Sequence, residues 1–325
     1  MEVLTNAPVL NRDHDHARDL ASVPKPKPKI EVPLPRPASK EPLDIALKEV
    51  LAQLQRLPKV AQAGGDSLTY AEQALEYRLK EFEVLVAGMI EGRDDVVLRQ
   101  QSIVDELGDE LPDEIRAPGE KPLPQAPTFF DKLIELINLI GERYLNIYKD
   151  IVDKFSAFFD AFNSQITSKL QQWMEAVNEG KDIELDVGEL KKALEALLAE
   201  LDDELFKGSK EDAAKWCEAL GLPASCLRDN GDGTWSVLID RSPLTQMIED
   251  LVALKAGKDG KVVLDSASFQ AWQTGFNAQT ERLKNKLQEL TQKYSSANTT
   301  YDNFIKVLSN HINQFTEMLK AMTHT

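Results

Sequence analysis

Apolar residues recur every three or four positions along two long segments of the chain. In residues 269–322 an apolar or small residue occupies every core position of a heptad ladder except Gln279, and no proline interrupts it. A helix of this length would extend on the order of 80 Å, since each residue adds about 1.5 Å. The pattern predicts a coiled-coil helix over residues 266–323.

The other ladder runs through residues 128–177 and predicts a coiled-coil helix of similar length. Its apolar stripe broadens near Phe158–Phe159, which indicates more than one packing neighbour there. Two such helices separated by an inserted domain favour one intramolecular antiparallel coiled coil. The residues expected in its seam are Tyr144, Ile151, Phe158, Leu283, Leu287, Leu290, Tyr294, Tyr301 and Leu308.

The N-terminal third carries two shorter apolar stripes, which predict a helical hairpin over residues 41–110. The first stripe is expected to stop at Pro58, and Gly64–Gly65 to form the turn. A short third segment from Val96 to Leu107 follows the break at Gly92. The hairpin stripes need burial, and we expect them to pack on the rod, where the broadened face near Phe158–Phe159 is available.

Proline-rich segments flank this hairpin. Residues 1–40 hold seven of the sixteen prolines, which favours a disordered leader, and residues 111–127 form a Pro-rich linker. Residues 178–265 mix helical stripes with short alternating segments. The Asn230–Gly233 turn precedes alternating Trp235, Val237 and Ile239, so an inserted mixed α/β domain is expected. The fold class is therefore mainly α, built on the coiled coil with a hairpin and an insert.

Charge and hydropathy restrict the possible partners. The net charge of −16 is concentrated outside the last helix, because residues 41–126 carry 9 basic and 18 acidic groups and residues 266–325 carry 6 and 4. Clustered Lys and Arg are needed for phosphate contacts, so nucleic acid is not expected as a partner. No apolar run approaches a transmembrane length, and the N-terminus lacks the pattern of a cleaved signal.

Residues able to support catalysis or metal binding show no convergent pattern. Cys217 and Cys226 are read as buried free thiols, with a disulfide formed after export or metal binding as the alternatives left open. No phosphate loop or nucleophile elbow occurs in the sequence, and no histidine lies four residues from another on a predicted helix. We therefore expect no catalytic residues, metal or cofactor, and a protein that is not an enzyme.

The last helix also carries polar residues outside its seam. These have small or amide side chains in place of the Glu/Lys pairs usual on a solvated coiled-coil flank, which indicates a docking face, with a merely solvated surface as the alternative left open. The residues of this predicted docking face are Asn298, Asp302, Asn303, Lys306, Ser309 and Asn310.

Three blocks of sequence resemble type III secretion needle-tip proteins of the IpaD, SipD and BipD group. Residues 269–309 resemble the family's terminal helix, and residues 141–162 (GERYLNIYKDIVDKFSAFFDAF) resemble its first rod. The insert shares Leu185–Asp186 and Leu220–Pro223. Residues 1–127 match the family in plan only, and the end of the chain diverges. Matching residues in the terminal helix are Trp272, Gly275, Phe276, Gln279, Leu290–Ser295, Asn298, Asp302, Asn303 and Lys306–Ser309.

The resemblance implies a protein secreted through the type III apparatus that caps the needle tip as a small oligomer. It implies control of secretion, sensing of host cues such as bile salts, and support for assembly of the translocator proteins. The expected partners are the needle subunit, a translocator, other copies of the chain and bile salts. Needle subunits and other copies of the chain are expected to meet the coiled-coil face, and the needle subunit and bile salts to bind the docking face on the last helix. The hairpin would act as a built-in chaperone. The alternative is a pore-forming translocator or membrane-active helical toxin.

Overall fold

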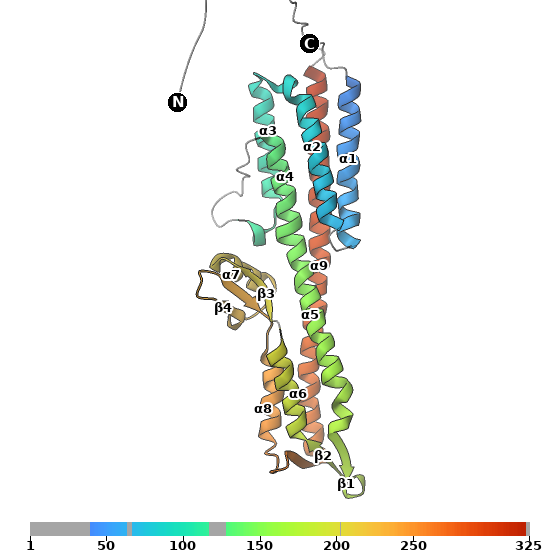
Figure 1. Cartoon of the computed structure of the whole chain (residues 1–325), viewed down its shortest axis with the longest axis vertical. Coiled ribbons are helices and arrows are strands. Elements are labelled where there is room, and N and C mark those ends of the chain that lie inside the picture. The colour runs from blue at the N-terminus through green and yellow to red at the C-terminus, as the bar shows by residue number, and fades with distance from the viewer. Residues whose placement is uncertain (1–39, 64–66, 117–127, 202, 323–325) are drawn as a thin grey trace, which may run out of the picture. The chain divides into compact units, whose positions relative to one another are not determined.

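A computed structural model describes residues 40–63, 67–116, 128–201 and 203–322. The predicted leader and most of the predicted linker lie outside the described residues. The described chain is mainly helical, with two small antiparallel sheets. The predicted fold class, an antiparallel coiled coil with an N-terminal hairpin and a mixed insert, is confirmed by its element order (Figure 1).

Two helical segments form the rod. The first is nearly continuous across three elements, and the second is the 57-residue helix α9. Phe129 packs near Phe315 and Phe162 near Phe276, so the two segments run antiparallel. Both segments begin at an N-cap residue. Thr128 Oγ1 accepts a hydrogen bond from the Asp131 backbone N–H, and Asp265 Oδ1 accepts one from the Ser268 backbone N–H. The elements are α4 (Phe129–Ile140), the π-helical turn η2 (Gly141–Leu145), α5 (Asn146–Gln165) and α9 (Ser266–Met322).

The prediction of one helix over residues 128–177 is wrong at its C-terminal end. Helix α5 stops at Gln165, a 3-10 segment η3 (Thr167–Trp173) follows, and residues Met174–Val177 form strand β1. Strand β1 pairs with β2 (Asp182–Asp186) across a tight turn. Apolar residues keep the helical spacing to Val177, but the sheet ladder satisfies the backbone in this segment and overrides local periodicity.

Among the described residues, the α-helices that precede the rod are α1 (Lys40–Ala63), α2 (Ser67–Ile90) and α3 (Asp94–Asp109). The prediction that Pro58 ends the first helix is wrong, because Pro58 lies inside α1. A proline in a helix interior costs about 3 kcal/mol. Leu57 and Ala61 on either side of it are buried, and their packing offsets that cost.

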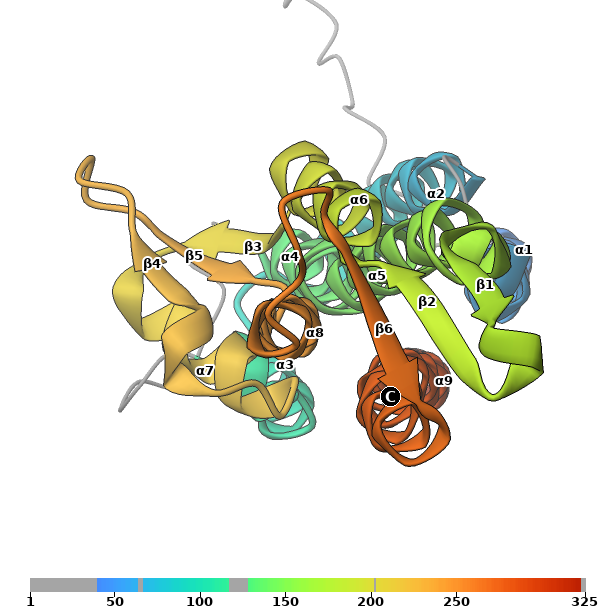
Figure 2. The same cartoon turned by 90° about the horizontal axis from the view of Figure 1, so that it is seen from below.

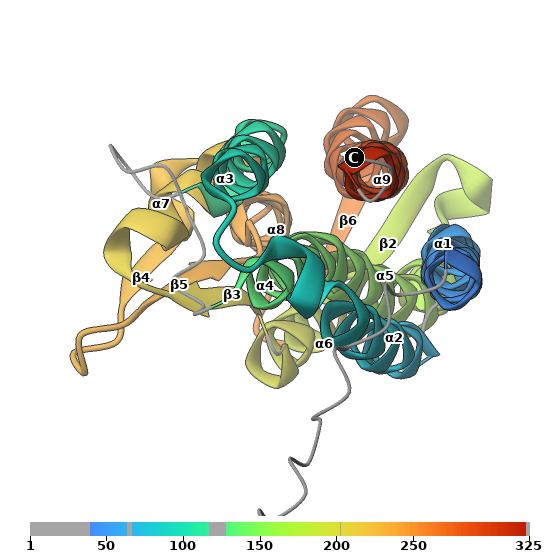
Figure 3. The ribbon, with the colours of Figure 1, turned by 90° about the horizontal axis from the view of Figure 1, so that it is seen from above.

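Helices α1, α2 and α3 pack on α4 and on the C-terminal half of α9 (Figures 1 and 3). Lys320 of α9 pairs with Asp44 of α1, and the Phe82 ring of α2 meets that of Phe130. The expectation that the hairpin uses the face near Phe158–Phe159 is therefore wrong. Helix α6 (Val187–Glu200) of the insert packs beside Phe158 instead, because the insert follows directly from the end of this rod segment.

The insert contains both sheets. Strand β2 lies between β1 and β6 in one sheet, and β5 lies between β3 and β4 in the other. Figure 2 shows the first sheet beside the ends of α5 and α9. The remaining elements are η1 (Asp113–Ile115), η4 (Asn178–Gly180), α6 (Val187–Glu200), β3 (Glu204–Gly208), α7 (Lys210–Ala219), η5 (Ala224–Cys226), β4 (Leu227–Asp229), β5 (Trp235–Leu238), α8 (Ser242–Ala253) and β6 (Lys261–Asp265).

Candidate functional site

Helix α9 has a buried stripe along its whole length. Of the residues predicted for the coiled-coil seam, most are buried and two are half-buried, Leu287 and Tyr294. The buried ones are Tyr144, Ile151, Phe158, Leu283, Leu290, Tyr301 and Leu308. The stripe packs α9 against α1 and α3 of the N-terminal helices, against α5 of the rod and against α8 of the insert.

The predicted docking face lies along one side of α9, and its residues differ in how far their side chains are exposed to solvent. Asn303, Lys306 and Asn310 are exposed, and Asp302 beside them is half-buried. The Lys306 ammonium pairs with the Asp302 carboxylate one turn earlier, with Lys306 65% exposed. An exposed i,i+4 pair adds only a few tenths of a kcal/mol to stability. We call these four residues the outer polar face, and the stability of the rod depends little on the ion pair within it.

The other two predicted docking residues bond within their own helix. Asn298 Nδ2 donates to the Tyr294 carbonyl at 3.1 Å, and Ser309 Oγ donates to the Ile305 carbonyl at 2.7 Å. Both side chains are half-buried. Each hydroxyl or amide thus satisfies a local backbone group at the edge of the buried stripe. The structure does not bring them together with the outer polar face as a single exposed surface.

A buried carboxylate joins the hairpin to the rod, and sequence reasoning missed it. Glu72 of α2 is only 6% exposed, and the Tyr301 hydroxyl of α9 donates to its Oε1 at 3.2 Å. Burial raises the pKa of Glu72 to about 7, against the lowering effect of the Tyr301 hydrogen bond, and nearby Glu142 raises it further. The signal in the sequence was a glutamate on the same helical face as Leu68, Leu75 and Leu79.

A histidine lies at a second contact between the N-terminal helices and the rod. His311 Nε2 of α9 is 3.5 Å from Glu106 Oε2 of α3, and the side chain is 12% exposed. Desolvation lowers the pKa of His311 more than the Glu106 charge raises it. Its Nδ1 is buried and has no hydrogen-bond partner among the described residues. The neutral imidazole is therefore the favoured form at this contact.

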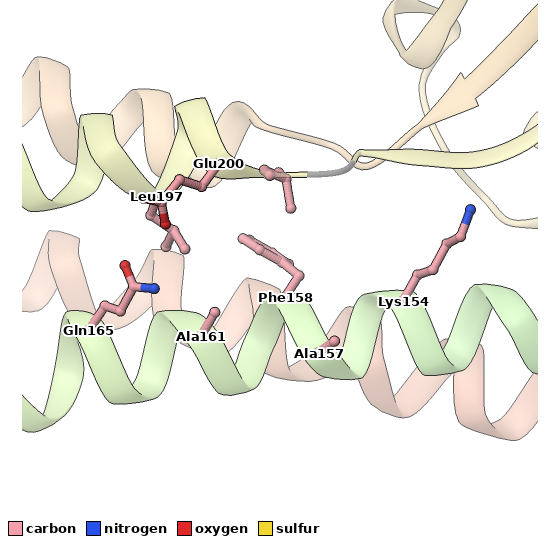
Figure 4. A pocket seen from close by; sticks show the side chains of 8 residues that line it. Lys154, Ala157, Phe158, Ala161, Gln165, Leu197 and Glu200 are labelled. Atoms are coloured by element: carbon pink, nitrogen blue, oxygen red, sulfur yellow. The ribbon is translucent and has the colours of Figure 1, made fainter.

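An apolar cavity of about 310 Å³ lies between α5 and α6. Phe158 points from α5 toward Leu197 of α6, and Lys154 stands at one end of the cavity (Figure 4). The Lys154 ammonium donates to the Glu204 carbonyl at 2.5 Å. A largely apolar lining with a few polar or charged groups, here Lys154, Gln165 and Glu200, is typical of a small-molecule site. The other lining residues are Ala157, Ala161, Gln165, Glu200 and Leu201.

The cysteines offer no reactive thiol. Cys217 and Cys226 are free and buried. Burial raises the pKa of both thiols, that of Cys226 to about 12, so neither forms a thiolate near neutral pH. Within the described ranges, no cluster of three or more His, Cys, Asp or Glu side chains is placed to hold a metal ion. In the same ranges, none of the helices combines the length and the hydropathy of a membrane span.

Residues 122–322 match the family model described as type III secretion systems tip complex components. The cell invasion protein SipD of Salmonella typhimurium is 38% identical over 207 residues, 59% of this chain and 60% of that protein. Invasin IpaD of Shigella flexneri is 38% identical over 199 residues, 59% of each chain. The alignments thus span about 60% of the length of these relatives.

A solved structure agrees with these sequence matches. The pathogenicity island 1 effector protein from Chromobacterium violaceum is similar with a TM-score of 0.60 and 29% identity, covering 86% of this chain and 98% of that one. The family match covers both rod segments and the insert, the parts that carried the resemblance in the sequence. The chain therefore belongs to the family of type III secretion system tip complex components, proteins secreted by that apparatus and located at the needle tip.

Proposed function

We propose that this chain caps the needle of a type III secretion apparatus, restrains secretion before host contact and supports assembly of the translocator proteins. The observation that carries the proposal is the family match over both rod segments, combined with an exposed polar face on α9. The partners are the needle subunit, a translocator and further copies of the chain in a small oligomer. No group of catalytic residues is needed for this role.

Within this proposal, the needle subunit binds the outer polar face of Asp302, Asn303, Lys306 and Asn310. These side chains project from a helix that is anchored along its other side by buried residues, so the face is held rigidly. Lys306 supplies an ammonium for a carboxylate of the partner, and the amides supply directional hydrogen bonds. Asn298 and Ser309 take no direct part, since both bond within α9.

Needle isolation tests the capping role. Needles sheared from bacteria that express the full chain should carry this protein. The same sheared fraction from cells that lack the needle subunit gene should not contain it. Deletion of the chain should release secretion before host contact. Absence of the chain from purified wild-type needles, with unchanged control of secretion, would contradict the proposal.

We further propose that α1, α2 and α3 act as a built-in chaperone for the rod. They bury apolar residues of α4 and of the C-terminal half of α9, and ion pairs such as Lys80–Asp131 connect the two parts. Removal of residues 1–127 would expose that apolar surface and should raise the oligomer fraction in sedimentation. An unchanged monomer after this removal would count against the chaperone role.

Bile-salt sensing, expected from the resemblance, fits the α5–α6 cavity better than the polar face of α9. A steroid carboxylate has a rigid apolar body and one anionic end, and the cavity combines Phe158 and Leu197 with Lys154. Its volume of about 310 Å³ lies at the lower end of the range for ligand pockets, roughly 300–1,000 Å³. A ligand bound there would contact both the rod and the insert, so its binding could change how the two pack together.

A further inference from the structure

Glu72 lies where three elements meet. It projects from α2, contacts Tyr301 of α9 through its Oε1, and approaches Gly141 at the start of the π-helical turn. A Cβ atom added to Gly141 would lie 2.1 Å from that oxygen. A side chain at position 141 would therefore displace the end of the Glu72 side chain from its contact with Tyr301. The position is therefore a specific contact between the hairpin and the rod.

The carboxyl group has no positive partner. Glu72 makes no ion pair within the part of the chain that the structure describes. The groups that act on it are the Tyr301 hydroxyl from α9 and the Glu142 carboxylate from the π-helical turn, and none is contributed by α1. Tyr301 is fully buried, so water does not replace the missing cation from that side. An ionised carboxylate is costly in such a site, and the neutral acid is not.

We propose that Glu72 is a proton-dependent latch that holds α2 on the rod when its carboxyl group is protonated and loosens it when the group ionises. The contact depends on protonation because the buried Glu72 carboxyl group has one hydrogen bond, from Tyr301, and one neighbouring carboxylate, that of Glu142. This inference does not depend on needle binding, because it concerns only the attachment of the hairpin.

The direction of the pH dependence follows from linkage. Burial raises the pKa of Glu72 from 4.5 to about 7 in the docked state, and a released, hydrated Glu72 would return to its ordinary value. The docked state then binds the proton more tightly, so its extra stability is complete below pH 4.5 and is lost as pH rises through 7. Between pH 6 and pH 8 the docking equilibrium changes by about tenfold.

Hydrogen exchange of the full chain measures this latch. The exchange rate of each α2 amide is divided by its intrinsic rate at pH 6, 7 and 8, which gives the opening equilibrium at each pH. We expect α2 protection in the parent to fall about tenfold from pH 6 to pH 8, and protection of α7 in the insert to stay constant. Glu72→Gln keeps the shape and removes the titration, so its α2 protection should not change with pH.

Two further variants make the test specific. Glu76→Gln removes an exposed carboxylate from the same helix and should behave as the parent does. Tyr301→Phe removes the hydrogen bond that favours the ionised form, so the fall in protection should move to higher pH. The latch is excluded if α2 protection in the parent is independent of pH, or if Glu72→Gln retains the slope of the parent.

Discussion

Phe162 of α5 and Phe276 of α9 stack with ring centroids 6.5 Å apart, near the insert end of the rod. At its other end, the rings of Phe129 and Phe315 lie 5.2 Å apart. The two pairs fix the antiparallel alignment of rod segments that are far apart in sequence. The two pairs also mark the two ends of the rod at which other parts of the chain pack. The insert packs near the first pair, and the N-terminal helices pack near the second.

The stability of the rod should depend on how deeply each seam residue is buried. Leu308 is fully buried and Leu287 is half-buried on the same helix. We expect Leu308→Ala to lower the free energy of unfolding by about 3 kcal/mol and Leu287→Ala by about 1 kcal/mol. Urea titration followed by circular dichroism measures both. Equal losses for the two variants would show that α9 does not pack as described.

The glycine beside Glu72 should be sensitive to a single methyl group. Gly141→Ala places a Cβ atom against Glu72 Oε1, and we expect a loss of about 2 kcal/mol in the free energy of unfolding. Gly88→Ala in α2 is the matched control, because a Cβ there meets no atom within 4 Å. That control should gain about 0.5 kcal/mol, since alanine favours a helix over glycine.

A double-mutant cycle assigns the effect of Gly141→Ala to its cause. In a Glu72→Ala background the carboxyl group is absent, so Gly141→Ala should cost little beyond the background variant. The two changes should therefore couple by more than about 1 kcal/mol in thermal or urea unfolding. Additive losses would mean that the π-helical turn, and not the contact with Glu72, is what requires glycine.

His311 should make the chain less stable in mild acid. The pKa of this imidazole is lowered from 6.5, so the unfolded chain binds its proton more tightly. The contribution of His311 to stability is present above pH 6.5 and is lost as pH falls below it. His311→Gln should reduce the fall in melting temperature from pH 7 to pH 5, measured in a Glu72→Gln background to remove the opposite effect of that acid. If the melting temperature falls equally from pH 7 to pH 5 with and without His311→Gln, this prediction is contradicted.

Lys154 should recognise the anionic end of a bile salt in the α5–α6 cavity. We expect Lys154→Gln to weaken deoxycholate binding several-fold by isothermal titration, because a charge-assisted contact contributes about 1.5–3 kcal/mol and part of it is screened by water. Lys149→Gln on the same helix, whose ammonium pairs with Asp153, is the control and should bind as the parent does. Equal binding by all three proteins would place the ligand elsewhere.

Periodicity predicted the rod because packing follows it there. Leu283, Leu290 and Leu308 recur at coiled-coil spacing and are all buried in the structure. The same periodicity failed after Ile166, where apolar residues keep the spacing up to Val177 but the chain forms a 3-10 segment and then strand β1 (Met174–Val177). A strand partner is a non-local feature, so the local pattern could not predict it.

The candidate site was predictable only in outline. Exposure of Asn303, Lys306 and Asn310 follows from their position opposite the seam. The contact of Glu72 with Tyr301 could not be predicted, because it depends on how α2 packs against α9 and on the π-helical turn at Gly141. Local sequence patterns do not specify such tertiary contacts.

Binding of purified needle subunit to the full chain tests the central claim most directly. Lys306→Glu reverses a charge on the outer polar face, and Lys284→Glu reverses an exposed charge elsewhere on α9 that is likewise paired with a nearby acid. Both should change the free energy of unfolding by no more than about 0.5 kcal/mol. The account predicts that Lys306→Glu weakens needle binding at least several-fold while Lys284→Glu binds as the parent does; equal affinity of all three proteins for the needle subunit would contradict it.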